Sequence, residues 1–77
     1  MRAGKLFKDL GFTRIKHNTS LIYQSQNDYT DLTVYFDLNN KTYFVSCSNF
    51  IDTYVNIDVR LHIAIHQQLR ELNWIMY

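Results

Sequence analysis

The sequence predicts an α+β domain: a short amino-terminal helix, an antiparallel meander of four to five strands, and a long carboxy-terminal helix packed on one face of the sheet. Two observations carry this prediction. Between Leu32 and Cys47, two runs of alternating apolar residues flank Asn39-Asn40, which is the pattern of a β-hairpin. From about Val59 to Asn73, apolar residues recur at intervals of three and four, as on one side of a helix.

Length and composition favour one domain over residues 1–77. A chain of 77 residues has room for one modest core, and 47% hydrophobic residues with 16% aromatic residues are enough to fold it. The single cysteine, Cys47, excludes an internal disulfide and favours a reducing compartment, so we expect a cytoplasmic protein. Charged residues interrupt the first twelve positions and no run reaches membrane-spanning length, so we expect neither a signal peptide nor a membrane segment.

The elements before the main hairpin are a helix and a first hairpin. Lys5–Leu10 has apolar residues at helical spacing and precedes Gly11, a residue suited to ending helices. Phe12–His17 and Leu21–Ser25 alternate, and Asn18-Thr19 lies between them as a two-residue turn.

The main hairpin has a register that follows from counting across Asn39-Asn40, where asparagine tolerates the positive φ of a type I′ turn. One side of the sheet, expected to be the core side, pairs Phe36 with Tyr43, Val34 with Val45 and Leu32 with Cys47. The opposite side pairs Tyr35 with Phe44 and Thr33 with Ser46, which leaves an aromatic pair on the face that the helix does not cover.

After the hairpin, Ser48 to Ile57 is either strand or loop, and a short strand near Tyr54 to Ile57 is favoured. Asp58 then has the position of an N-cap for the long helix. The stripe expected to face the sheet consists of Leu61, Ala64, Ile65, Gln68, Leu69 and Leu72. Because Gln68 lies within this stripe, its amide needs hydrogen-bond partners. We expect these to be backbone groups at a sheet edge or in a loop such as Ser48 to Asp52. The alternative is that the amide binds a ligand.

The opposite side of the long helix is the preferred partner-binding surface. It carries Val59, Ile63, His66, Arg70 and Trp74. Trp and Arg are over-represented among the residues that dominate interfaces, and three bulky apolar residues exceed what a solvated helix needs. A homodimer through paired carboxy-terminal helices is one interpretation, and cover of Trp74 by the amino-terminal helix is the other.

Other residue patterns suggest chemistry less specifically. His62 and His66 have the spacing of two metal ligands, but the segment lacks the glutamate of an HExxH site and a cysteine pair, so surface histidines are favoured. Cys47 is expected to be a buried, inert thiol, with a dyad to His17 as the alternative. Tyr35 and Phe44, with Arg14 and Lys16 nearby, suggest a stacking platform for single-stranded nucleic acid, which the acidic residues of the same hairpin oppose.

Several residues along the chain match a known group of proteins: Phe7, Leu10, Gly11, Phe12, Tyr23, Phe36-Asp37, Lys41-Thr42-Tyr43, Ala64-Ile65, Gln68 and Glu71-Leu72-Asn73-Trp74. In these residues the chain resembles small, mostly uncharacterised proteins encoded by phages and prophages of Gram-positive bacteria. That group usually has glycine before the tryptophan, where this chain has Asn73. The resemblance implies a short sheet followed by a long helix and a phage origin, and it transfers no activity or site residues.

The function expected from these observations is a non-enzymatic protein that binds and occludes a host or defence protein, in the manner of an anti-CRISPR inhibitor. No catalytic, cofactor-binding or metal-binding residues are assigned. The expected partner-binding residues are Val59, Ile63, His66, Arg70, Trp74, Tyr35 and Phe44. The alternative is a small nucleic-acid-binding regulator that uses the exposed sheet face, although the net charge of +1 gives no overall excess of positive charge.

Overall fold

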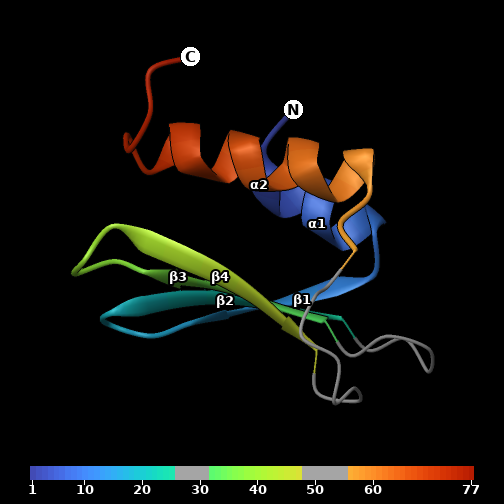
Figure 1. Cartoon of the computed structure of the whole chain (residues 1–77), viewed down its shortest axis with the longest axis horizontal. Coiled ribbons are helices and arrows are strands. Elements are labelled where there is room, and N and C mark those ends of the chain that lie inside the picture. Colours follow the sequence, from blue (N-terminus) through green and yellow to red (C-terminus); the bar gives the residue numbers. More distant parts are fainter. Residues whose placement is uncertain (26–31, 48–55) are drawn as a thin grey trace.

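The computed structural model describes residues 1–25, 32–47 and 56–77, and it confirms the predicted α+β fold. Two helices lie on one side of a four-stranded antiparallel sheet with the strand order β1-β2-β3-β4 (Figure 1). The elements are α1 (Ala3–Asp9), β1 (Phe12–Lys16), β2 (Ser20–Ser25), β3 (Leu32–Asp37), β4 (Thr42–Cys47) and α2 (Val59–Glu71). The strand expected near Tyr54 to Ile57 falls largely outside the described residues, and Ile57 itself is not in a strand.

The first hairpin has the predicted turn. The backbone N–H of His17 donates to the carbonyl of Ser20 at 2.9 Å, so Asn18 and Thr19 are the two residues of the turn. Strand β1 then pairs with β2 in the register that this turn dictates, with Ile15 opposite Ile22.

The second hairpin has the predicted pairs, including Tyr35 opposite Phe44, but a different turn. The positive φ belongs to Lys41, at 55°, and not to Asn39 or Asn40. The Asp37 carboxylate accepts hydrogen bonds from the backbone N–H groups of both asparagines, at 3.0 and 3.2 Å. These bonds favour negative φ angles at the two asparagines. The predicted type I′ turn is therefore wrong. Four residues connect β3 to β4, and the last of them, Lys41, takes the left-handed conformation.

The core lies between the sheet and both helices. Its centre is an aromatic stack in which the rings of Phe7 from α1 and Tyr23 from β2 are 3.8 Å apart and inclined by 8°. Phe36 meets Tyr23 edge to face, and Val34 completes the sheet side. The buried residues of α2 are Leu61, Ala64, Ile65 and Gln68, with Leu69 and Leu72 packed against the cluster, which confirms the predicted stripe.

Helix α2 begins at the predicted cap. The Asp58 carboxylate accepts a hydrogen bond from the backbone N–H of Leu61 at 2.8 Å. This bond, assisted by Arg60, holds the pKa of the Asp58 carboxyl below its usual value. The cap therefore favours the ionised carboxylate at neutral pH.

The end of α2 corrects the predicted position of Trp74. The helix ends at Glu71 and not at Asn73, and Asn73 takes the left-handed conformation with φ 60°. The N–H groups of Asn73 and Trp74 donate to the carbonyls of Arg70 and Leu69, both at 3.0 Å, in the pattern of a Schellman motif. The reversal turns Trp74 back onto the core, where its ring meets Phe36 edge to face at 6.2 Å. Trp74 therefore does not lie on the outer side of the helix.

The two helices are also joined directly. The backbone N–H of Ala3, in the first turn of α1, donates to Oε2 of Glu71 at 2.7 Å. This bond places the carboxylate at the positive end of the α1 dipole. It fixes the start of the chain against the end of α2.

Candidate protein-binding surfaces

Gln68 has an intramolecular partner within the core. Its Oε1 accepts a hydrogen bond of 2.6 Å from the hydroxyl of Tyr23, and both side chains are buried. The prediction of a backbone partner at a sheet edge is wrong for Oε1, which bonds to the Tyr23 phenol, and the predicted loop, Ser48 to Asp52, lies outside the described residues. Burial raises the pKa of Tyr23, with Arg14 acting in the opposite direction. Over the described residues, every buried side-chain nitrogen and oxygen has a partner, so the amide needs no ligand.

The two histidines of α2 lie on the exposed side of the helix. The rings of His62 and His66 are stacked with centroids 6.4 Å apart, and the ring of Tyr77 lies 6.3 Å from His66. In the part of the chain that the structure describes, no group of three potential ligands among His, Cys, Asp and Glu surrounds a common point.

Cys47 lies opposite Leu32 as predicted, but it is half-buried and not fully buried. His17 directly follows β1, and the strands β2 and β3 separate β1 from β4 in the sheet. His17 lies at the end of the sheet where β4 begins, whereas Cys47 is the last residue of β4 and lies at the other end. The pairing places His17 in the row of Thr42, and the five residue steps from Thr42 to Cys47 span about 17 Å of extended strand. The alternative of a dyad between Cys47 and His17 is therefore wrong.

A cavity of about 270 Å³ opens at the end of the sheet, below the start of α2. Its lining consists of Leu10, Phe12, Ser25, Leu32, Asn56, Asp58, Arg60 and Leu61. The two charged lining residues are paired with each other at 3.4 Å, and the carboxylate also caps α2. Within the described part of the lining, both charges therefore already have an intramolecular partner.

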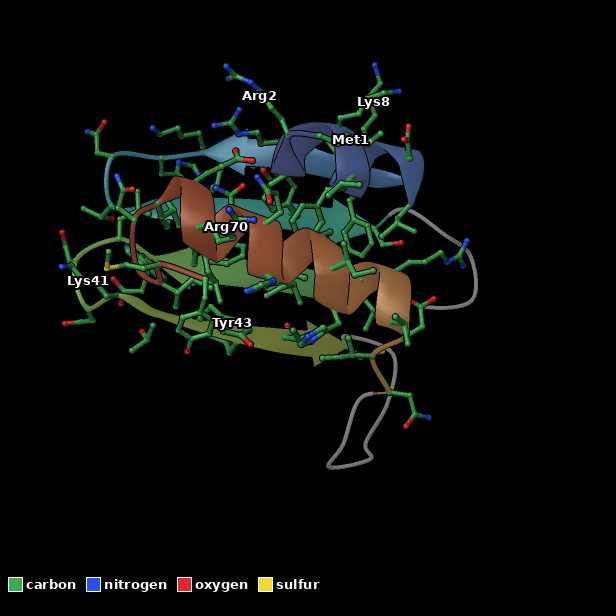
Figure 2. All side chains as sticks on the ribbon, turned by 90° about the horizontal axis from the view of Figure 1, so that it is seen from above. Met1, Arg2, Lys8, Lys41, Tyr43 and Arg70 are labelled. Carbon is green, nitrogen blue, oxygen red and sulfur yellow. The ribbon has the colours of Figure 1, made fainter. Side chains whose placement is uncertain are left out.

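The outer α2 surface, defined here as Val59, Ile63, His66 and Arg70, matches the prediction except for Trp74. Val59 is 73% exposed and Ile63 is 50% exposed, and they lie one turn apart. Arg70 is exposed and His66 is half-buried. Figure 2 shows Arg70 on the helix, with Arg2 and Lys8 along the neighbouring α1. The surface thus joins an apolar pair to cationic side chains.

The second surface is the open face of the sheet, the face opposite the two helices (Figure 1). Tyr35 and Phe44 lie there as predicted, with ring centroids 5.0 Å apart and 17° between the ring planes. The pairing also places Ile22 beside Tyr35 and Ile15 beside Ile22. These four residues form one continuous line across all four strands, here called the sheet row. Sequence reasoning missed Ile15 and Ile22, although the Asn18-Thr19 turn already pairs them.

The cations expected beside the aromatic pair lie elsewhere. Arg14 is opposite Tyr23 and Lys16 is opposite Leu21, both of which are buried beneath the helices. Because side chains alternate along a strand, Arg14 and Lys16 belong to the helix side of the edge strand β1 and not to the open face. The expectation that they accompany Tyr35 and Phe44 is wrong. The two rings also stack on each other, so each has one face already covered.

Comparison of the chain with protein-family models, with curated proteins and with solved structures finds no match. The resemblance to phage-encoded proteins remains a prediction. Of the helices that the structure describes, none is both long and apolar enough to cross a membrane.

Proposed function

We propose that this chain is a non-enzymatic protein-binding domain that acts by covering a surface of a partner protein with its outer α2 surface. The observation that carries the proposal is the exposure of Val59 and Ile63 on a helix whose other side already fills the core. Two large aliphatic side chains one turn apart are the anchors by which an amphipathic helix enters an apolar groove. Their exposure therefore supports a contact with a protein.

The charges around this pair define the partner surface that would fit it. Arg70 follows Ile63 along the helix and is exposed, whereas Arg60, at the first turn, is already paired with the Asp58 carboxylate at 3.4 Å. The carboxylate of the neighbouring Glu71 keeps its negative charge but is held toward α1, where it accepts hydrogen bonds from the backbone of Ala3 and the side chain of Gln67. The complementary partner surface is an apolar groove with acidic residues at its rim.

The resemblance to phage-encoded proteins suggests which class of partner to test. Small phage proteins often act by binding a protein of the host or of its defence systems, CRISPR nucleases included. On this proposal the protein works in the bacterial cytoplasm and inhibits by occlusion, without chemistry of its own.

Affinity capture from a lysate of the native host tests the proposal with three baits. The wild-type chain and Phe44→Glu should both retain the same protein, because Phe44 lies on the opposite side of the molecule. Val59→Glu/Ile63→Glu should lose it, since the charges would enter the apolar contact. Both exposed sites tolerate charge, so far-UV circular dichroism of the baits should agree. Retention of the protein by Val59→Glu/Ile63→Glu would show that this surface is not the binding site.

A further inference from the structure

The sheet row is an apolar line that crosses the whole sheet on the face away from the two helices. It runs from Ile15 on β1 through Ile22 and Tyr35 to Phe44 on β4, with each residue paired to the next. Phe44 is 55% exposed, and the other three are half-buried. Neither helix that the structure describes lies on this side (Figure 1). A flat apolar line across a sheet is the geometry by which two sheets pack face to face.

The open face is almost without charge. Beside the sheet row, the polar side chains that the strands place on it are Thr13, Ser20, Gln24, Thr33, Asp37, Thr42 and Ser46. Asp37 is the one charged residue among them, and its carboxylate already accepts three hydrogen bonds from Asn39 and Asn40. A face of this kind neither attracts phosphate nor repels a copy of itself.

The size of the side chains changes in one direction along the sheet row. The β1 and β2 positions hold isoleucine, whereas β3 and β4 hold the aromatic pair Tyr35 and Phe44. A two-fold axis parallel to the strands, between β2 and β3, would lay Phe44 over Ile15 of a second copy and Tyr35 over Ile22 of that copy. Each large ring then meets a smaller aliphatic side chain, which is how facing positions of two layers interdigitate.

We propose that the open face packs against the same face of a second copy, which forms a two-layer sheet dimer with the helices outside. The face measures about 20 Å on each side, from four strands about 4.8 Å apart and strands of about 3.3 Å per residue. Pairing it removes on the order of 1,000 Å² from water over both copies, close to the lower limit of specific interfaces. Interfaces of this size are often transient, so we expect a reversible dimer whose formation depends on concentration.

The outer α2 surface is a poorer self-contact for an electrostatic reason. In a parallel pair of α2 helices Arg70 would meet Arg70 of the second copy. Like charges opposed across an interface cost affinity, so the helix suits an acidic partner better than a parallel copy of itself. The sheet dimer leaves both outer α2 surfaces free on opposite sides. It does not depend on the proposed function, and it would make the protein bivalent.

Sedimentation equilibrium over a micromolar concentration series tests the dimer. The wild-type chain should dimerise, and Phe44→Glu should raise the dissociation constant at least about 100-fold, because each dimer would bury two unpaired carboxylates. Ile63→Glu is the matched control, since it places the same charge at a site of similar exposure on the helix. It should leave the dissociation constant unchanged. A wild-type chain that stays monomeric, or a dimer lost in Ile63→Glu and kept in Phe44→Glu, would overturn the proposal.

Mixing two variants tests the orientation of the copies. Phe44→Glu and Ile15→Lys should each be monomeric alone, whereas an equimolar mixture should form a heterodimer, because the introduced carboxylate of one chain faces the introduced ammonium of the other. A mixture that stays monomeric would refute this arrangement. Methyl NMR of the wild-type chain needs no substitution: dilution should shift the signals of Ile15 and Ile22 and leave those of Val59 and Ile63 in place, and the reverse pattern would refute the sheet contact.

Discussion

Removal of one hydroxyl group from the core gives a direct measure of the bond between sheet and helix. Tyr23→Phe keeps the ring stacked on Phe7 but leaves Oε1 of Gln68 without its donor. The ring of Tyr23 is 1% exposed and Gln68 is 6% exposed, so water reaches this acceptor poorly. An unpaired buried polar group costs about 1–3 kcal/mol, and we expect a loss of about 2 kcal/mol in the free energy of unfolding. For a domain of this size that lowers Tm by roughly 8–16 °C.

The companion substitution separates the loss of the bond from damage to the packing. In Tyr23→Phe/Gln68→Met neither polar group remains, so most of the lost stability should return, although each single variant is destabilised. Thermal and urea unfolding at neutral pH, followed by circular dichroism, give the four free energies of the double-mutant cycle. Tyr43→Phe is the control: that ring is 44% exposed and should change the stability by less than about 0.5 kcal/mol. The reasoning fails if Tyr23→Phe is as stable as the wild-type chain, or if the two single losses simply add.

Three further predictions concern stability. Burial raises the pKa of the Tyr23 hydroxyl, so folding favours its neutral form; this stability is fully present below about pH 10 and is lost as pH rises toward the raised pKa. Urea unfolding at pH 8 to 11.5 should show the decline, and Tyr23→Phe should reduce it. Lys41→Gly should raise stability by about 0.5–1 kcal/mol, because Lys41 has φ 55° and glycine adopts this conformation without steric cost; equal or lower stability in thermal melts would contradict this. Asn73→Ala should lower stability by about 1 kcal/mol while Asn73→Gly does not, and identical Tm values for both variants would argue against the helix-end geometry.

Local sequence signals predicted the parts of the fold that neighbours along the chain determine. Asp58 caps α2, and the positions of the two turns set the register of their hairpins. Each of these features depends on hydrogen bonds between residues a few positions apart, which a pattern in the sequence contains. The aromatic pair of Tyr35 and Phe44 follows from the same counting.

Two errors arose where one local signal overrode another. Helical spacing placed Trp74 on the outside of the long helix, but the reversal at Asn73 directs it to Phe36. The Asn39-Asn40 pair suggested positive φ, but the Asp37 carboxylate bonds to both backbone N–H groups and moves the left-handed residue to Lys41. In both cases the prediction rested on a short pattern, the helical spacing or the Asn39-Asn40 pair. The residues that make the deciding contacts, Phe36 and Asp37, lie outside those patterns.

By itself, the sequence determined the order of helices and strands, the pairs within each hairpin and the buried side of the long helix, because periodicity and turn chemistry act over a few residues. Only the tertiary structure decided that Tyr23 is the partner of Gln68, and that Ile22 lies beside Tyr35 to complete the sheet row. The register between β2 and β3 is not set by a two-residue turn, and burial against the helices is what selects it. Contacts between residues distant along the chain depend on the packing of whole elements, and no local pattern encodes them.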